Sequence, residues 1–121
     1  MAAPNLVNVT TITAKSTQGD LTTTVTTEFL ANAAASGKVF KVNSILVANI
    51  DGTNSADASV FITKSGGSPI AIASTIAVPA DSTLTVIDKN TAIYLEEGDN
   101  SEAGASADSD LVITINYEEL S

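Results

Sequence analysis

The chain alternates apolar and polar side chains with a period of two, which restricts it to strands over much of its length. The alternation is clearest over residues 21–29, 70–78 and 111–117. In the last of these, one face carries Leu111, Ile113, Ile115 and Tyr117. Because successive side chains of a strand point to opposite faces, this pattern predicts half-buried strands rich in β-branched residues. In residues 70–78 the same reasoning places Ile70, Ile72, Ile76 and Val78 on one face.

Other segments complete the prediction of an all-β protein. Shorter strands are predicted over residues 5–14, 57–64, 83–88 and 91–95. The run Val39 to Ile50 has apolar residues on both faces, which predicts a central strand that is covered on both sides. One helix candidate extends from Thr27 to Ser36, although a short turn before Gly37 is favoured over a full helix.

Turn residues separate these strands at short intervals. They cluster at Asp51-Gly52-Thr53-Asn54, Gly66-Gly67, Pro79-Ala80-Asp81-Ser82 and Gly98-Asp99-Asn100. Short strands at this spacing favour an antiparallel β-sandwich of about eight strands, either jelly-roll or immunoglobulin-like. A chain of 121 residues is expected to form a single domain over residues 1–121, with residues 1–5 as an extended N-terminal arm.

Composition removes most of the side chains that catalysis uses. The chain has no cysteine, histidine, tryptophan or arginine. Thus no histidine base, cysteine zinc site or guanidinium clamp can form. Paired carboxylates such as Glu96-Glu97 and Glu118-Glu119 lie beside turns or at the terminus, and no serine has a local base. We therefore expect a protein that is not an enzyme and has no cofactor.

Acidic residues are concentrated in the last third of the chain. Residues 1–80 hold four acids and four lysines, whereas residues 81–121 hold ten acids and one lysine, Lys89. The acidic part is either a solubilising face or a surface for a basic partner or divalent cations. Five lysines cannot form a phosphate-binding patch, so nucleic acid is not expected as a partner. Neither a signal peptide nor an apolar stretch long enough for a membrane span is recognisable, which predicts synthesis in a host cytoplasm and no membrane contact.

One loop offers oxygen ligands for a metal. Asp51, Asn54 and Asp57 could bind calcium, which needs only hard oxygen donors. The spacing does not match an EF-hand, and the bidentate glutamate that closes such a loop is missing. The alternative is that all three are ordinary solvated turn residues.

Several short phrases of the chain together resemble a known group of proteins. The phrases are Ala3-Pro4-Asn5-Leu6-Val7-Asn8-Val9-Thr10-Thr11-Ile12, Gly37 to Gly52, Ala73-Ser74-Thr75-Ile76-Ala77-Val78-Pro79-Ala80, Tyr94-Leu95-Glu96-Glu97-Gly98-Asp99 and Tyr117-Glu118-Glu119-Leu120-Ser121. In their order these phrases resemble small virion structural proteins of marine, cyanophage-like tailed phages. The similarity covers most of the chain and does not lie in a catalytic motif.

This resemblance implies a structural component of a virion. Its best fit is a capsid decoration (cement) protein that binds the major capsid protein or other virion proteins. The alternative is a neck, tail or fibre-associated protein that is structural or contacts a host glycan. The resemblance also implies a homo-oligomer, with a trimer favoured. Contacts with a neighbour are expected from the extended N-terminus, at Pro4, Asn5, Leu6 and Val7, which could add a strand to an adjacent sheet.

Overall fold

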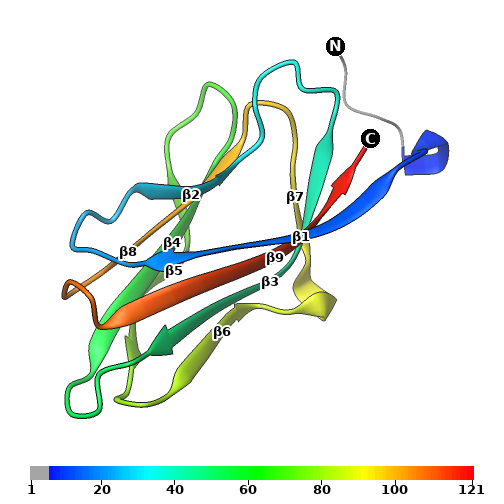
Figure 1. Cartoon of the computed structure of the whole chain (residues 1–121). Helices are drawn as coiled ribbons and strands as arrows, with labels where there is room; N and C mark the ends of the chain where they lie inside the picture. Colours follow the sequence, from blue (N-terminus) through cyan, green and yellow to red (C-terminus); the bar gives the residue numbers. More distant parts are fainter. Residues whose placement is uncertain (1–5) are drawn as a thin grey trace.

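The computed structural model describes residues 6–121, and this part of the chain is 57% strand and 4% helix. Nine antiparallel strands form two sheets, so the predicted all-β sandwich is confirmed (Figure 1). In chain order the elements are η1 (Leu6–Asn8), β1 (Ile12–Asp20), β2 (Thr27–Ala31), β3 (Val39–Asn49), β4 (Ala56–Thr63), β5 (Ile70–Val78), β6 (Thr83–Ile87), η2 (Lys89–Thr91), β7 (Ile93–Leu95), β8 (Asn100–Ala105) and β9 (Leu111–Leu120).

The strand order identifies the type of sandwich. The five-stranded sheet has the order β1-β9-β3-β6, with β7 also pairing with β3, and the four-stranded sheet has the order β2-β8-β4-β5. The chain changes sheet at nearly every connection, and only the β4–β5 and β6–β7 connections stay within one sheet. If β6 and β7 are counted as one interrupted strand, this is the eight-stranded jelly roll. Of the two sandwich types expected from the sequence, the structure has the jelly roll.

The core lies between β3 and β9 of one sheet and β4 and β8 of the other. The alternation predicted for residues 111–117 is confirmed at Leu111, Ile113 and Ile115, which are all buried. Ala58, Val60 and Ala103 close the core from the four-stranded sheet. The small side chains on this second sheet let the two layers approach closely around the branched residues of the first.

A bulge in β3 corrects the prediction that this strand is covered on both sides. The pairing with β9 shifts between Val42 and Ser44, which leaves Asn43 as an extra residue. An extra residue reverses which face the following side chains occupy. Phe40 and Val42 before the bulge and Ile45 and Val47 after it are therefore all buried in one core. The sequence has apolar residues at even positions before Asn43 and at odd positions after it. The register shift places both sets on the same face of the sheet.

The N-terminal half differs from the sequence prediction in three segments. Residues 5–14 were expected to form a strand, but η1 occupies Leu6–Asn8 and β1 begins at Ile12. Residues 21–26 are not a strand but the connection between β1 and β2, anchored where the amide of Leu21 donates to the carbonyl of Leu111. Residues 27–31 are strand rather than helix, and the chain turns before Gly37, where a positive φ of 74° occurs.

Strand β5 is present as predicted, but most of its apolar face is not buried. Val78 is buried, whereas Ile70, Ile72 and Ile76 are 66%, 40% and 41% exposed. The reason is position, because β5 is the last strand of its sheet and pairs only with β4. Two register shifts, between Ala58 and Val60 and between Val60 and Phe61, also disturb its alternation.

Gly104 in β8 should be a point where the fold tolerates no side chain. A Cβ atom at this position would lie 2.2 Å from the Cα of Val25, in the connection that crosses β8. We expect Gly104→Ala to lower the free energy of unfolding by about 2–3 kcal/mol, because the backbone itself must move. Urea denaturation monitored by circular dichroism measures the change.

Gly52→Ala is the matched control. The nearest atom to a Cβ at Gly52 is Oδ2 of Asp81 at 3.6 Å, an ordinary contact. This variant should stay within about 0.5 kcal/mol of the parent protein. Equal losses of stability in the two variants would contradict the packing described for residues 21–26.

Candidate functional site

Exposed apolar side chains, rather than clustered acids, identify the candidate surfaces. Within residues 6–121 no group of three or more His, Cys, Asp or Glu side chains is arranged to hold a metal. Neither helical turn in the same range has the length and hydropathy to cross a bilayer. Besides Val25 and Ile50, the exposed large apolar side chains fall into two groups. One is the N-terminal patch, formed by Val9, Ile12 and Tyr94 around one hollow together with Val7, two residues before Val9 in the chain. The other is the β5 strip, formed by Ile70, Ile72 and Ile76.

The pairing of the two ends of the domain positions the N-terminal patch. The amides of Thr10 and Thr11 both donate to the carbonyl of Ser121 at 2.9 Å, and the amide of Ser121 donates back to Thr11. This pairing continues the β1–β9 ladder beyond Ile12 and brings the segment after η1 next to the end of β9. Figure 1 shows η1 and the C-terminus at the same end of the molecule.

A shallow hollow of about 270 Å³ lies within the N-terminal patch. Val9, Ile12, Tyr94 and Leu120 give it apolar walls, and Lys41 and Glu118 add one charge of each sign. The sheet pairing explains this set, because Lys41 lies opposite Tyr94 on β7 and opposite Glu118 on β9. The result is an apolar surface with a polar margin, which is the usual composition of a protein-binding patch.

The structure describes only part of the predicted interaction segment, and interaction at Pro4, Asn5, Leu6 and Val7 stays a prediction. Pro4 and Asn5 lie outside the described residues, so the extended arm stays a prediction. Leu6 begins η1, and Val7 in its middle is 88% exposed. Ile12 and Tyr94 were not singled out from the sequence, since each falls in a predicted strand and only the sheet order shows that its side chain is exposed.

The three calcium candidates do not form one cluster of free oxygens. Oδ1 of Asp51 accepts hydrogen bonds from the amides of Thr53 and Asn54, and these bonds lower the pKa of Asp51. The side-chain amide of Asn54 donates to the other oxygen of Asp51. Asp57 belongs to β4, and its amide donates to Oγ of Ser106 on the far side of the loop. The geometry is that of a self-closed turn, and calcium binding at Asp51, Asn54 and Asp57 stays a prediction.

Asp99 is a buried carboxylate that joins two loops. Its side chain is 2% exposed and accepts from Nζ of Lys64, from the amide of Ser65 at 2.9 Å and from the amide of Glu96 at 2.8 Å. Burial pushes the pKa of Asp99 up, but the hydrogen bonds from Lys64, Ser65 and Glu96 outweigh it, so the pKa lies below its usual range. The carboxylate thereby fastens the β4–β5 turn to the turn after β7.

Glu119 joins β9 to two other segments in a similar way. It accepts from Nζ of Lys38 at 2.6 Å and from Nζ of Lys15 at 2.9 Å, and these bonds lower its pKa. Lys15 lies on β1, Lys38 precedes β3 and Glu119 lies on β9. The two lysines therefore hold neighbouring strands against the end of β9, and we interpret this cluster as structural.

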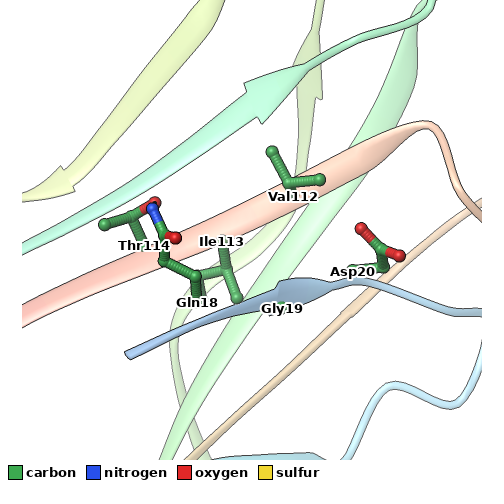
Figure 2. A pocket seen from close by; sticks show the side chains of 6 residues that line it. All are labelled: Gln18, Gly19, Asp20, Val112, Ile113 and Thr114. Carbon is green, nitrogen blue, oxygen red and sulfur yellow. The ribbon is translucent and has the colours of Figure 1, made fainter. Parts of the chain in front are cut away.

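A second hollow, of about 340 Å³, lies between β1 and β9 (Figure 2). Gln18, Gly19 and Asp20 line it from β1, and Val112, Ile113 and Thr114 line it from β9. At one end Nε2 of Gln18 donates to Oγ1 of Thr114 at 3.3 Å. Gly19 leaves room for Phe29, since a Cβ atom at this position would lie 2.6 Å from Cε1 of the Phe29 ring and the ring would have to move. The surface is open and carries a single charge, so it offers little to hold a ligand.

Replacing Asp99 should reveal how much this buried carboxylate stabilises the protein. Because the pKa of Asp99 is lowered by folding, its contribution is complete above the ordinary value and is lost as the pH falls through the folded pKa. We expect Asp99→Asn to cost about 2–3 kcal/mol of unfolding free energy at pH 7, since the amide nitrogen would face at least one donor whichever carboxylate oxygen it replaces. The difference from the parent should shrink as the pH falls below the ordinary pKa of an aspartate and toward the lowered pKa of Asp99, where the parent carboxylate also becomes neutral.

Glu96→Gln is the control for this measurement. Glu96 binds the same Lys64, but its side chain is 67% exposed. This variant should change the unfolding free energy by no more than about 0.5 kcal/mol at any pH. A difference between Asp99→Asn and the parent protein that stays constant as the pH falls from 7 to well below the ordinary pKa of an aspartate would contradict a charged Asp99.

Comparison with known families and with curated sequences found no match to the chain: no known protein family matches it, and no curated protein is significantly similar to it in sequence. The resemblance to virion proteins of tailed phages therefore stays a prediction.

Proposed function

We propose that the chain is a non-enzymatic structural protein of a tailed-phage virion, and that it is a decoration (cement) protein bound to the capsid shell. The N-terminal patch is the observation that carries the proposal. Val7 is 88% exposed, Ile12 is 62% exposed and Tyr94 is 44% exposed. Grouped apolar side chains at the surface of a small domain mark a contact site for another protein.

The form of the patch suits a rigid contact. Tyr94 and Ile12 belong to strands β7 and β1, which pair with β3 and β9 at the centre of the five-stranded sheet. Side chains held by paired strands lose little further conformational freedom on binding. Lys41 and Glu118 at the margin provide charges of opposite sign that could fix the orientation of a partner.

The fold supports the same proposal at a coarser level. Jelly rolls serve as capsid and lectin domains, among other uses, so the architecture is compatible with a shell component without implying one. The partner would be the major capsid protein or another virion protein, and the site of action would be the assembled particle. No nucleic acid contact is needed in this role.

A neck, tail or fibre position is the alternative. One observation favours it, because Tyr94 presents a half-exposed ring beside Lys41 and Glu118 in a hollow. An aromatic ring next to polar groups is a common arrangement for holding a sugar. In that case the protein would touch a host glycan rather than the shell.

Copy number in purified particles distinguishes the two positions. Quantitative mass spectrometry of the phage that encodes the chain should find hundreds of copies per particle if it decorates the shell. A dozen copies or fewer would overturn the decoration role in favour of the neck or tail. Absence from washed particles would overturn both.

Charge introduced into the N-terminal patch should release the protein from the particle. We expect Ile12→Lys to weaken binding to particles stripped of this protein by at least about tenfold, because a desolvated charge would lie within the contact. Ile50→Lys is the control, since Ile50 is 61% exposed but lies in the turn after β3. Equal binding by the two variants, both folded by circular dichroism, would exclude the N-terminal patch as the docking surface.

A further inference from the structure

Strand β5 presents an edge that could be extended by another strand. It is the last strand of the four-stranded sheet, is nine residues long and is bracketed by Pro69 and Pro79. An edge strand points half of its backbone amides and carbonyls away from the sheet. Natural proteins usually protect an edge of this length with charges, prolines or bulges, by shortening it or by covering it, and β5 has only its two flanking prolines and its register shifts.

The side chains of β5 leave this edge apolar. Ile76 lies opposite Ala58 and Ile70 lies opposite Ile62, whose side chains belong to or pack against the core. Opposed residues of an antiparallel pair point to the same face, so Ile70 and Ile76 point to the core side of the sheet. They are nevertheless 66% and 41% exposed, because no strand in residues 6–121 continues the sheet beyond β5. The β5 strip is thus a part of the core edge that the rest of the described chain leaves exposed to solvent.

Charge sets β5 apart from the other sheet edges. β1 carries Lys15 and Asp20, and β2 carries Glu28, whereas residues 65–80 contain no charged side chain. β6 and β7 are also uncharged but are only five and three residues long. In a chain of net charge −9, two copies repel each other over most of their surface. β5 is the long edge strand that carries no charge of its own, and the nearest charge on the paired strand is Asp57, opposite Ala77.

The order of residues in β5 makes the strip complementary to the same strip of a second copy. Read outward from Ser74, the strand places Ile72 against Ile76, Ala71 against Ala77 and Ile70 against Val78. In an antiparallel pair around a two-fold axis, these are the residues that would lie opposite one another in two copies. A two-fold interface requires such self-complementarity, because each surface meets its own copy.

We infer that β5 pairs antiparallel with β5 of a second copy of this chain, around a two-fold axis at Ser74. The two four-stranded sheets then form one continuous sheet, and the exposed isoleucines of each copy cover those of the other. The inference is independent of the virion proposal, because it uses neither the N-terminal patch nor any other partner.

The bulge at the centre of β5 shapes this pairing. Thr75 has a φ of 47°, and its amide donates to Oγ of Ser59 rather than continuing the regular ladder. Bulges bend a strand and increase its twist. The second register shift leaves Ile72 as an extra residue between Ala71 and Ala73. The pairing should therefore consist of two short, irregular arms, each joining residues 70–73 of one copy to residues 75–78 of the other. Such a short contact predicts a reversible dimer with a dissociation constant of order micromolar rather than a permanent one.

A single introduced thiol tests the axis. The chain has no cysteine, so Ser74→Cys would carry the only thiol. Residues directly opposite each other have Cα atoms about 4.5–5.5 Å apart, within the range that a disulfide spans. We expect mild oxidation of this variant to give a disulfide-linked dimer within minutes. Thr85→Cys, on the exposed edge strand β6, should stay largely uncrosslinked.

Sedimentation equilibrium tests the strip without a crosslink. The parent protein should form dimers at about 10–100 μM, and Ile70→Lys should raise the dissociation constant at least about tenfold. Ile50→Lys, with a similarly exposed isoleucine, should leave the dissociation constant unchanged. Ile12→Lys should leave it unchanged as well, which separates this interface from the N-terminal patch.

Three results would overturn the inference. These are a parent protein that stays monomeric at 100 μM, a Ser74→Cys variant that crosslinks no faster than Thr85→Cys, and a dimer or trimer that Ile70→Lys does not weaken. The last result would place self-association on another surface, including the threefold contact expected from the sequence resemblance. Loss of particle binding in Ile12→Lys with an intact dimer would leave both proposals standing.

Discussion

The insertion of β9 between β1 and β3 is the constraint on which the rest of the fold depends. Its ten residues pair with nine positions of β1 and ten positions of β3, and its inward side chains form the middle of the core. The five-stranded sheet therefore cannot be completed until the last residues of the chain are in place. The same insertion brings Ser121 next to Thr11 and creates the N-terminal patch. Because most of these contacts join residues far apart in sequence, the domain should fold slowly and as one unit.

Charge distribution follows from the same arrangement. The four ion pairs found in residues 6–121 all join lysines from the neutral first part of the chain to acids from the last third. Lys15 and Lys38 meet on Glu119, and Lys64 meets Asp99 and Glu96. Part of the acidic concentration is thus explained by the folding of the C-terminal strands against N-terminal ones. The remaining acids stay at the surface and give the molecule its net charge.

The sequence predicted the fold class because alternation is a local property of the chain. β9 and β3 were recognised from their branched residues, and β5 was recognised as a strand. The predictions that were wrong or missing concern features that depend on neighbouring strands, and the sequence does not reveal which strands are neighbours. β8 was missed because Asn100–Ala105 is built from small and polar residues, which are selected by close packing rather than by strand propensity. The alternation of residues 21–26 was misleading, and the bulge at Asn43 made a one-sided strand look two-sided.

Exposure was the property least accessible to sequence reasoning, and it determines both proposed surfaces. The isoleucines of β5 and those of β9 have the same alternation, yet one set lies at a sheet edge and the other at a sheet centre. Only the strand order separates an interface from a core. The N-terminal patch and the β5 strip lie on different sheets, so a molecule could use one for a shell and the other for its own copy. A small domain with two such surfaces could link neighbouring sites, which is the mechanical task of a cement protein.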